Sequence, residues 1–126
     1  MNRDAVWIAG AGLSGLSTAI GLTRRGHRVD VFEKNADSGA SRRGHRNAIE
    51  NWTTKVDILQ LLQQAGIIAD FEYRSMPNIE ICIGSDARYI VSAQQPLCYL
   101  VKRGPEPGSL EYALKNQALD YGVNIH

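Results

Sequence analysis

A glycine-rich turn between a predicted strand and a predicted helix constrains this chain more than any other feature. Residues 5–33, AVWIAGAGLSGLSTAIGLTRRGHRVDVFE, predict a strand, a turn, a helix and a second strand that ends on an acid. Gly10, Gly12 and Gly15 complete the pattern GxGxxG, and Glu33 lies 18 residues after Gly15. In this strand–turn–helix context the spacing is that of dinucleotide-binding domains.

Each part of the turn has a separate physical task. Gly10 allows the sharp turn, Gly12 lets a diphosphate approach the backbone, and Gly15 lets the helix lie close to the strand. Backbone N–H groups at the start of the helix would face the phosphates, with help from the helix dipole. The predicted phosphate-binding residues are Gly10, Ala11, Gly12, Leu13, Ser14 and Gly15.

Glu33 indicates which dinucleotide the site would accept. Its carboxylate can accept hydrogen bonds from an adenosine ribose, and its charge would repel a 2′-phosphate. We therefore expect FAD, or less favourably NAD, and we expect NADP to be disfavoured. Lys34, the next residue, is included in the predicted site.

The segment 34–52, KNADSGASRRGHRNAIENW, shows no periodicity and predicts a long loop. A loop of this length inside a compact domain is either disordered or binds a ligand. Because it leaves the cofactor edge of the sheet, we place at least one of Arg42, Arg43 and Arg46 near a phosphate or flavin. Solvated surface charge is the alternative interpretation.

The middle of the chain predicts a helix and a small antiparallel sheet. The helix covers 54–64, with Thr53 or Thr54 as its N-cap. Three short strands follow at 79–83, 88–91 and 97–101, and short turns favour antiparallel pairing among them.

The end of the chain predicts a crossover back to the first sheet. Ser109 caps a helix over 110–121, and a strand begins at 123–126. A helix leading into such a strand favours a parallel neighbour, which we expect to be the second strand. Because the chain ends there, we expect a truncated parallel sheet.

The predicted fold class is therefore α/β, a Rossmann-like FAD-binding fold with a small antiparallel insertion. We divide the chain into three parts. Residues 1–53 form the dinucleotide unit with the predicted loop 34–52, which we call the cofactor loop. Residues 54–103 form the helix and the start of a substrate-side sheet, and residues 104–126 form the crossover helix and strand.

Composition excludes several other classes of function. The formal net charge of +1 gives no general attraction to nucleic acid. No apolar run reaches the length of a membrane span, and no signal peptide precedes the first strand, so we expect a cytoplasmic protein. Contact with a membrane surface stays open.

Two further expectations concern single residues. Cys82 and Cys98 lack the spacing of metal-binding cysteines, so we expect them to be buried and reduced. Trp7 is expected in the core.

The sequence resembles the FAD-dependent oxidoreductases of the geranylgeranyl-reductase type, within the flavoprotein group that includes the aromatic hydroxylases. The resemblance rests on three blocks: GAGLSGLSTAIGLTRRGHRVDVFEK, IENW with TTKVDILQLLQQAGI, and YLVKRGPEPGSLEYALKNQALDYGVNI. It implies that Arg103 lies against FAD, with surface charge as the alternative. In the cofactor loop, Ala40 replaces a glycine of the family and Ser41 stands where an arginine is expected.

The resemblance implies reduction of carbon–carbon double bonds in an apolar, isoprenoid-like substrate by the full-length enzyme, with no catalytic residue identified here. Three alternatives are a flavin monooxygenase, an NAD-only dehydrogenase, and a truncated fragment that binds nucleotide weakly and catalyses nothing. For the 126-residue chain alone we expect no catalysis and at most light yellow colour after purification.

Overall fold

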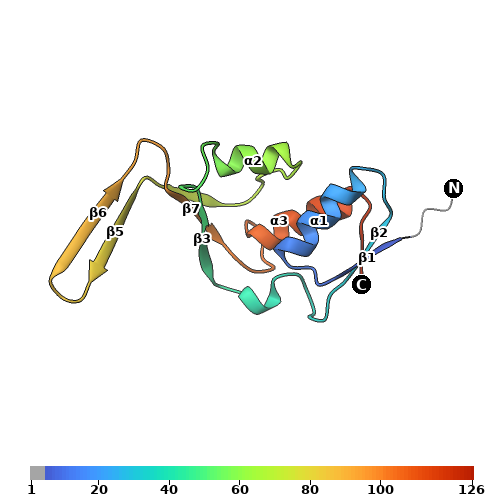
Figure 1. Cartoon of the computed structure of the whole chain (residues 1–126). Coiled ribbons are helices and arrows are strands. Elements are labelled where there is room, and N and C mark those ends of the chain that lie inside the picture. The colour runs from blue at the N-terminus through green and yellow to red at the C-terminus, as the bar shows by residue number, and fades with distance from the viewer. Residues whose placement is uncertain (1–4) are drawn as a thin grey trace.

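Three parallel strands form the sheet that carries the glycine-rich turn (Figure 1). The computed structural model describes residues 5–126. The strands are β1 (Val6–Ala9), β2 (Val29–Phe32) and β8 (Asn124–Ile125), in the order β1-β2-β8. The α/β Rossmann-like fold is thus confirmed, as is the parallel pairing of the last strand with the second.

Two helices cover one face of this sheet, α1 (Leu13–Thr23) and α3 (Leu110–Asp120). Leu16 and Ile20 of α1 are fully buried, as is Val31 of β2. The helices also contact each other, and the core continues along them through Ala19, Val29, Leu114, Ala118 and Val123. Burial of this apolar surface is the main stabilising term of the domain.

The opposite face of the sheet exposes aromatic side chains. Alternation along β1 directs Val6 and Ile8 toward the helices and Trp7 away from them, so that Trp7 is 75% exposed. Its ring contacts Phe32 edge-on, and Phe32 stacks on His126. The expectation that Trp7 lies in the core is therefore wrong.

The antiparallel part differs from the predicted single sheet. β7 (Cys98–Lys102) is the centre of one sheet, between β3 (Arg46–Glu50) and β4 (Tyr73–Met76). β5 (Asn78–Ile83) and β6 (Ala87–Ser92) form a separate hairpin, which projects away from the helices in Figure 1.

Two strands were thus not expected from the sequence. The predicted loop 34–52 contains β3, and β4 lies in a segment to which we assigned no element. Both are polar edge strands, and they become strands because the apolar β7 supplies their hydrogen-bond partners. Edge strands of this kind carry a weak period-2 signal.

The hairpin also corrects the prediction for one cysteine. Cys82 on β5 is exposed, whereas Cys98 on β7 is buried as expected. Cys82 lies on the face of the hairpin with Glu80 and Arg88, which form an ion pair at 3.3 Å. Neither cysteine is in a disulfide.

Helix α2 (Ile58–Gln64) begins later than expected, and its N-cap is Asp57 rather than Thr53 or Thr54. The Asp57 carboxylate accepts hydrogen bonds from the Leu59 N–H at 2.9 Å and from the Tyr99 hydroxyl at 2.6 Å. The helix is thereby attached to β7. At its other end, Arg24, the C-cap of α1, donates to the Ala65 carbonyl at 2.9 Å.

Residues 1–4, on which the expectation about a signal peptide partly rests, lie outside the described residues. From residue 5 onward, no helix combines the length and apolar character that crossing a bilayer requires. In the same range no three His, Cys, Asp or Glu side chains are grouped to hold a metal ion.

Replacing Asp57 with Ala should destabilise the protein by about 2–3 kcal/mol, because α2 loses its cap and the buried Tyr99 hydroxyl loses its acceptor. Burial alone would raise the pKa of Asp57, but hydrogen bonds from Tyr99, Leu59 and Asn51 outweigh it and lower the pKa. Burial and this carboxylate raise the pKa of Tyr99 to about 12.

A carboxylate whose pKa is lower in the folded than in the unfolded protein stabilises the fold at pH values above its unfolded-state pKa. This stabilisation is lost as the pH falls through its folded-state pKa. The difference in the free energy of unfolding between the wild type and Asp57→Ala, measured in urea, should therefore be largest at neutral pH and should shrink as the pH falls through the lowered pKa of Asp57. An unchanged difference in acid would contradict the role assigned to the charge.

Candidate functional site

A cavity of about 790 Å³ opens where the glycine-rich turn meets the cofactor loop. It brings together nine of the predicted site residues: Gly10, Gly12, Leu13, Ser14, Gly15, Glu33, Lys34, Arg42 and Arg103. Ala11, Ala40 and Arg43 do not line it. The sequence prediction missed six further lining residues: Ala9, Phe32, Asn35, Gly39, Ser41 and Glu111.

The three glycines of the turn differ in what they permit. Gly10 has φ +94°, which disfavours any residue with a side chain. A Cβ at Gly15 would overlap the Gly10 carbonyl oxygen, so this glycine allows the close approach of α1 to β1. A Cβ at Gly12 would meet nothing within 4 Å, although Gly12 lines the cavity. The space beside Gly12 is therefore open to a ligand.

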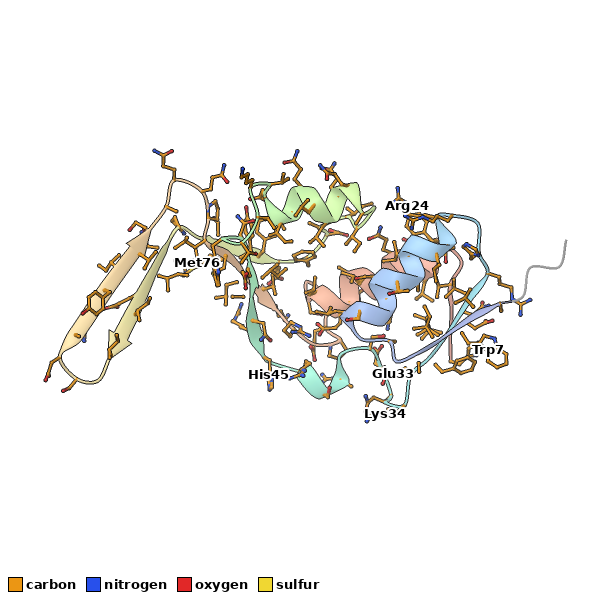
Figure 2. All side chains as sticks on the ribbon, viewed as in Figure 1. Trp7, Arg24, Glu33, Lys34, His45 and Met76 are labelled. Atoms are coloured by element: carbon orange, nitrogen blue, oxygen red, sulfur yellow. The ribbon has the colours of Figure 1, made fainter. Side chains whose placement is uncertain are left out.

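Glu33 joins the turn to the start of the loop. Its Oε1 accepts from the Asn35 N–H at 2.9 Å and the Asn35 side-chain amide at 2.7 Å, and its Oε2 accepts from the Ala11 N–H at 2.7 Å. The Asn35 N–H, followed by the Ala11 N–H, lowers the pKa of Glu33 below its usual value despite partial desolvation. The side chain is thus a carboxylate at neutral pH, and Figure 2 shows it at the cavity end of β2.

Ala11 was predicted to bind phosphate, but its N–H group binds the Glu33 carboxylate instead. It is fully buried, and its N–H is used by Glu33. It holds the carboxylate in place at the edge of the cavity. The signal for this contact is the GxGxxG…Glu spacing itself, which brings the turn and the end of β2 together.

The cofactor loop is ordered against α3. A 3₁₀ helix, η1 (Ala40–Arg42), follows Gly39 at φ +77°. Asp37 pairs with Lys115 of α3 at 2.7 Å, and Arg43 pairs with Glu106 just before α3. Arg43 thus points into an ion pair outside the cavity lining, while Arg42 lines the cavity.

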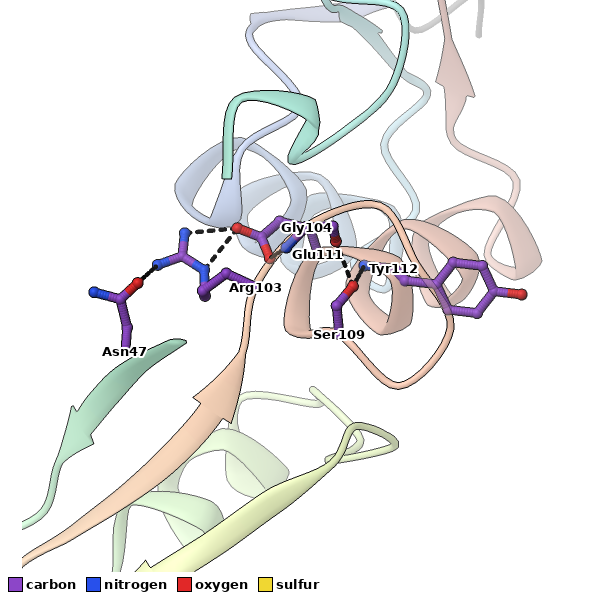
Figure 3. A network of polar contacts seen from close by, with 6 residues as sticks. All are labelled: Asn47, Arg103, Gly104, Ser109, Glu111 and Tyr112. Atoms are coloured by element: carbon purple, nitrogen blue, oxygen red, sulfur yellow. Dashed lines mark hydrogen bonds and ion pairs between the residues drawn. The ribbon is translucent and has the colours of Figure 1, made fainter. Parts of the chain in front are cut away.

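Arg103 and Glu111 form a polar network in the cavity wall (Figure 3). Arg103 donates through Nε at 2.7 Å and Nη2 at 2.6 Å to the Glu111 carboxylate, and through Nη1 at 3.1 Å to Asn47. The Gly104 N–H donates to the other carboxylate oxygen at 3.0 Å. Ser109 caps α3 as predicted, since its hydroxyl accepts from the Tyr112 N–H.

A second cavity, of about 480 Å³, lies between the segment 68–72 and α3. It is lined by Asp70, Glu72 and Asp120 and by none of the predicted site residues. These carboxylates would repel a diphosphate, whereas the cavity at the glycine-rich turn offers backbone N–H groups and arginines. The first cavity is therefore the candidate dinucleotide site.

Residues 8–58 match the family model described as "NAD(P)-binding Rossmann-like domain". This segment is therefore similar to dinucleotide-binding Rossmann domains, in agreement with the Rossmann-like fold. The match covers β1, α1, β2, the cofactor loop and the start of α2.

Among curated proteins, the chain is 36% identical over 116 residues to an L-amino-acid oxidase of Daboia russelii, covering 90% of this chain and 23% of the relative. The chain spans 14% to 23% of the length of the curated relatives it matches. Their similarity therefore concerns one part of a longer protein.

Two solved structures share the fold across almost the whole chain. The tetrameric form of 2-methyl-3-hydroxypyridine-5-carboxylic acid oxygenase aligns with a TM-score of 0.75 and 22% identity, covering 100% of this chain and 32% of that chain. The flavin-dependent brominase Bmp2 aligns with a TM-score of 0.64 and 17% identity, covering 98% and 29%. The fold of the domain is thus shared with an oxygenase and with a flavin-dependent brominase.

Gly15→Ala should destabilise the protein strongly, whereas Gly12→Ala should leave its stability almost unchanged. The methyl group at position 15 overlaps a backbone carbonyl, so we expect a loss of about 2–4 kcal/mol. The methyl group at position 12 enters open space at a residue with φ −80°, so stability should change by less than about 0.5 kcal/mol. Chemical denaturation of both variants checks this difference, and equal losses would contradict the described turn.

Proposed function

We propose that this chain is the FAD-binding portion of a flavoprotein oxidoreductase. The observation that carries the proposal is the open space beside Gly12, in a cavity that also contains the α1 N-terminus, Glu33 and two arginines. Relatives named as oxidases and structures named as an oxygenase and a flavin-dependent brominase support the same class.

The residues present suit a dinucleotide. The helix N-terminus offers unpaired N–H groups and a partial positive charge to the diphosphate. Glu33 uses three of its roughly four acceptor directions within the protein, which leaves one at Oε2 for a ribose hydroxyl. Its charge disfavours a 2′-phosphate, so the site favours FAD or NAD over NADP.

Bound FAD would supply the electron-transfer chemistry, and the chain's residues would bind and orient it. Lys34, Arg42 and Arg103 provide cationic groups around the cavity. We assign no acid or base to the reaction from the described residues. Their role in this proposal is to hold the cofactor.

The narrower hypothesis is that the complete enzyme reduces isoprenoid double bonds, as in the geranylgeranyl-reductase type. It is supported by the block YLVKRGPEPGSLEYAL, which forms β7, the Arg103 network and the start of α3. A flavin monooxygenase is the second candidate, favoured by the structural similarity to an oxygenase. The apolar hairpin residues Ile81 and Ile83 suit an apolar substrate in either case.

Cofactor choice is tested by titrating the purified chain with FAD, NAD and NADP, following flavin fluorescence or calorimetry. We expect FAD to bind more tightly than NAD, and NADP to bind least. Gly12→Val should abolish FAD binding while leaving the unfolding midpoint unchanged, because the branched side chain fills the space for phosphate. Gly21→Val is the matched control, since Gly21 lies in the same helix but does not line the cavity.

Binding of NAD without FAD would favour a dehydrogenase, and unchanged FAD affinity in Gly12→Val would contradict the proposed position of the diphosphate. Absence of binding to all three dinucleotides would contradict the function proposed for this chain.

Glu33→Gln should weaken NAD binding and reduce discrimination against NADP, because the repulsive charge is removed. Since the pKa of Glu33 is lowered, the wild-type preference should persist as pH falls to the usual glutamate range, near pH 4.3. The ratio of the two dissociation constants, measured at pH 7 and near pH 4.5, checks both statements. A ratio insensitive to Glu33→Gln would mean that this carboxylate does not face the ribose.

A further inference from the structure

Glu111 is an unexpected residue in the wall of a site for an anionic ligand. It lies in the first turn of α3, lines the cavity and is only 1% exposed. A buried carboxylate is costly unless it is paired and fully hydrogen-bonded. Near a diphosphate its charge would also oppose binding, so its presence calls for a compensating role.

The contacts of Glu111 determine the orientation of Arg103. One carboxylate oxygen receives both Nε and Nη2 of the guanidinium, and the other receives the Gly104 N–H. Asn47 accepts from Nη1 on the remaining side. Three of the five guanidinium N–H groups are thus directed at protein acceptors. The other two N–H groups belong to a side chain that lines the cavity.

The same residue supports the cofactor loop. A Cβ at Gly39 would lie 2.8 Å from the Glu111 Cβ and 3.0 Å from the Gly104 carbonyl carbon. The loop therefore lies directly on the Glu111 side chain. Through this residue the end of β7, the start of α3 and the loop meet at one point of the cavity wall.

We propose that Glu111 is a positioning residue of the dinucleotide site, which acts by holding Arg103 in the orientation that directs its remaining N–H groups at the bound dinucleotide. The inference rests on the proposed function. Because the ion pair is neutral as a unit, Arg103 contributes directional hydrogen bonds rather than net charge. A fixed planar guanidinium achieves this, and a lysine cannot.

The test is a double-mutant cycle on FAD affinity with the complete chain: wild type, Glu111→Gln, Arg103→Met and the double variant. Glu111→Gln and Arg103→Met should each weaken FAD binding at least about tenfold, as the loss of a charge-assisted contact predicts. The double variant should bind no more weakly than Arg103→Met, because Glu111 acts through Arg103. Glu80→Gln, which breaks an exposed ion pair on the hairpin, is the control and should bind as the wild type does.

A second variant keeps the test decisive if Glu111→Gln does not fold. Arg103→Lys retains the charge at a position with a partly accessible side chain, and it should lose FAD affinity nearly as strongly as Arg103→Met. Full affinity of Arg103→Lys would show that charge alone suffices and would overturn the inference.

Other outcomes separate the two proposals. If Glu111→Gln lowers the unfolding midpoint but binds FAD as the wild type does, Glu111 is purely structural and the inference fails while the proposed function stands. Additive losses in the double variant also overturn it. If the wild type itself binds no FAD, the proposed function fails, and the inference fails with it.

Discussion

The close contact between α1 and β1 at Gly15 is the constraint on which the rest of the structure depends. A side chain there would meet the Gly10 carbonyl, so the helix could not start beside the strand end. This start places the α1 N-terminus at the edge of the parallel sheet, next to Glu33 at the end of β2. The same position of α1 also brings it into contact with α3. The buried side chains of Leu16 and Ile20 then form part of the core. The close approach at Gly15 therefore positions both the candidate site and the core.

Distant parts of the chain complete what the turn begins. The cofactor loop would be a long irregular segment, but the Asp37–Lys115 and Arg43–Glu106 pairs attach it to α3 and to the residues before it. Partly exposed ion pairs contribute little stability one by one. Here they act together with the close approach of Gly39 to the Glu111 side chain. The loop can therefore line a cavity rather than move in solvent.

Local patterns explain what the sequence could predict. The GxGxxG turn, Glu33 and the Ser109 cap follow from local sequence motifs, and the parallel pairing of β8 with β2 follows from the rule for helix-to-strand crossovers; each lies where expected. The polar strands β3 and β4 could not be predicted, because β7 supplies their partners from far along the chain. Trp7 was misplaced for a related reason. Its strand is apolar on both faces, and the sequence does not show that α1 and α3 lie on the same face. Glu111 was missed because an acid in the first turn of a helix is usually a capping charge.

The charges around the cavity indicate how such a site would select its ligand. Lys34, Arg42 and Arg103 are basic, and Glu33 and Glu111 are acidic, so the lining is nearly neutral. A nearly neutral site gains little from long-range attraction of phosphate, and salt screens that attraction further. In the proposed site, selectivity would come instead from hydrogen bonds in fixed directions, made by the backbone N–H groups at the α1 N-terminus, the Glu33 carboxylate and the Arg103 guanidinium held by Glu111. These groups come from the ends of β2 and β7 and from the starts of α1 and α3, and they line one cavity. Under the proposed function, a dinucleotide would present both a diphosphate and a ribose to these groups, which a single phosphate does not.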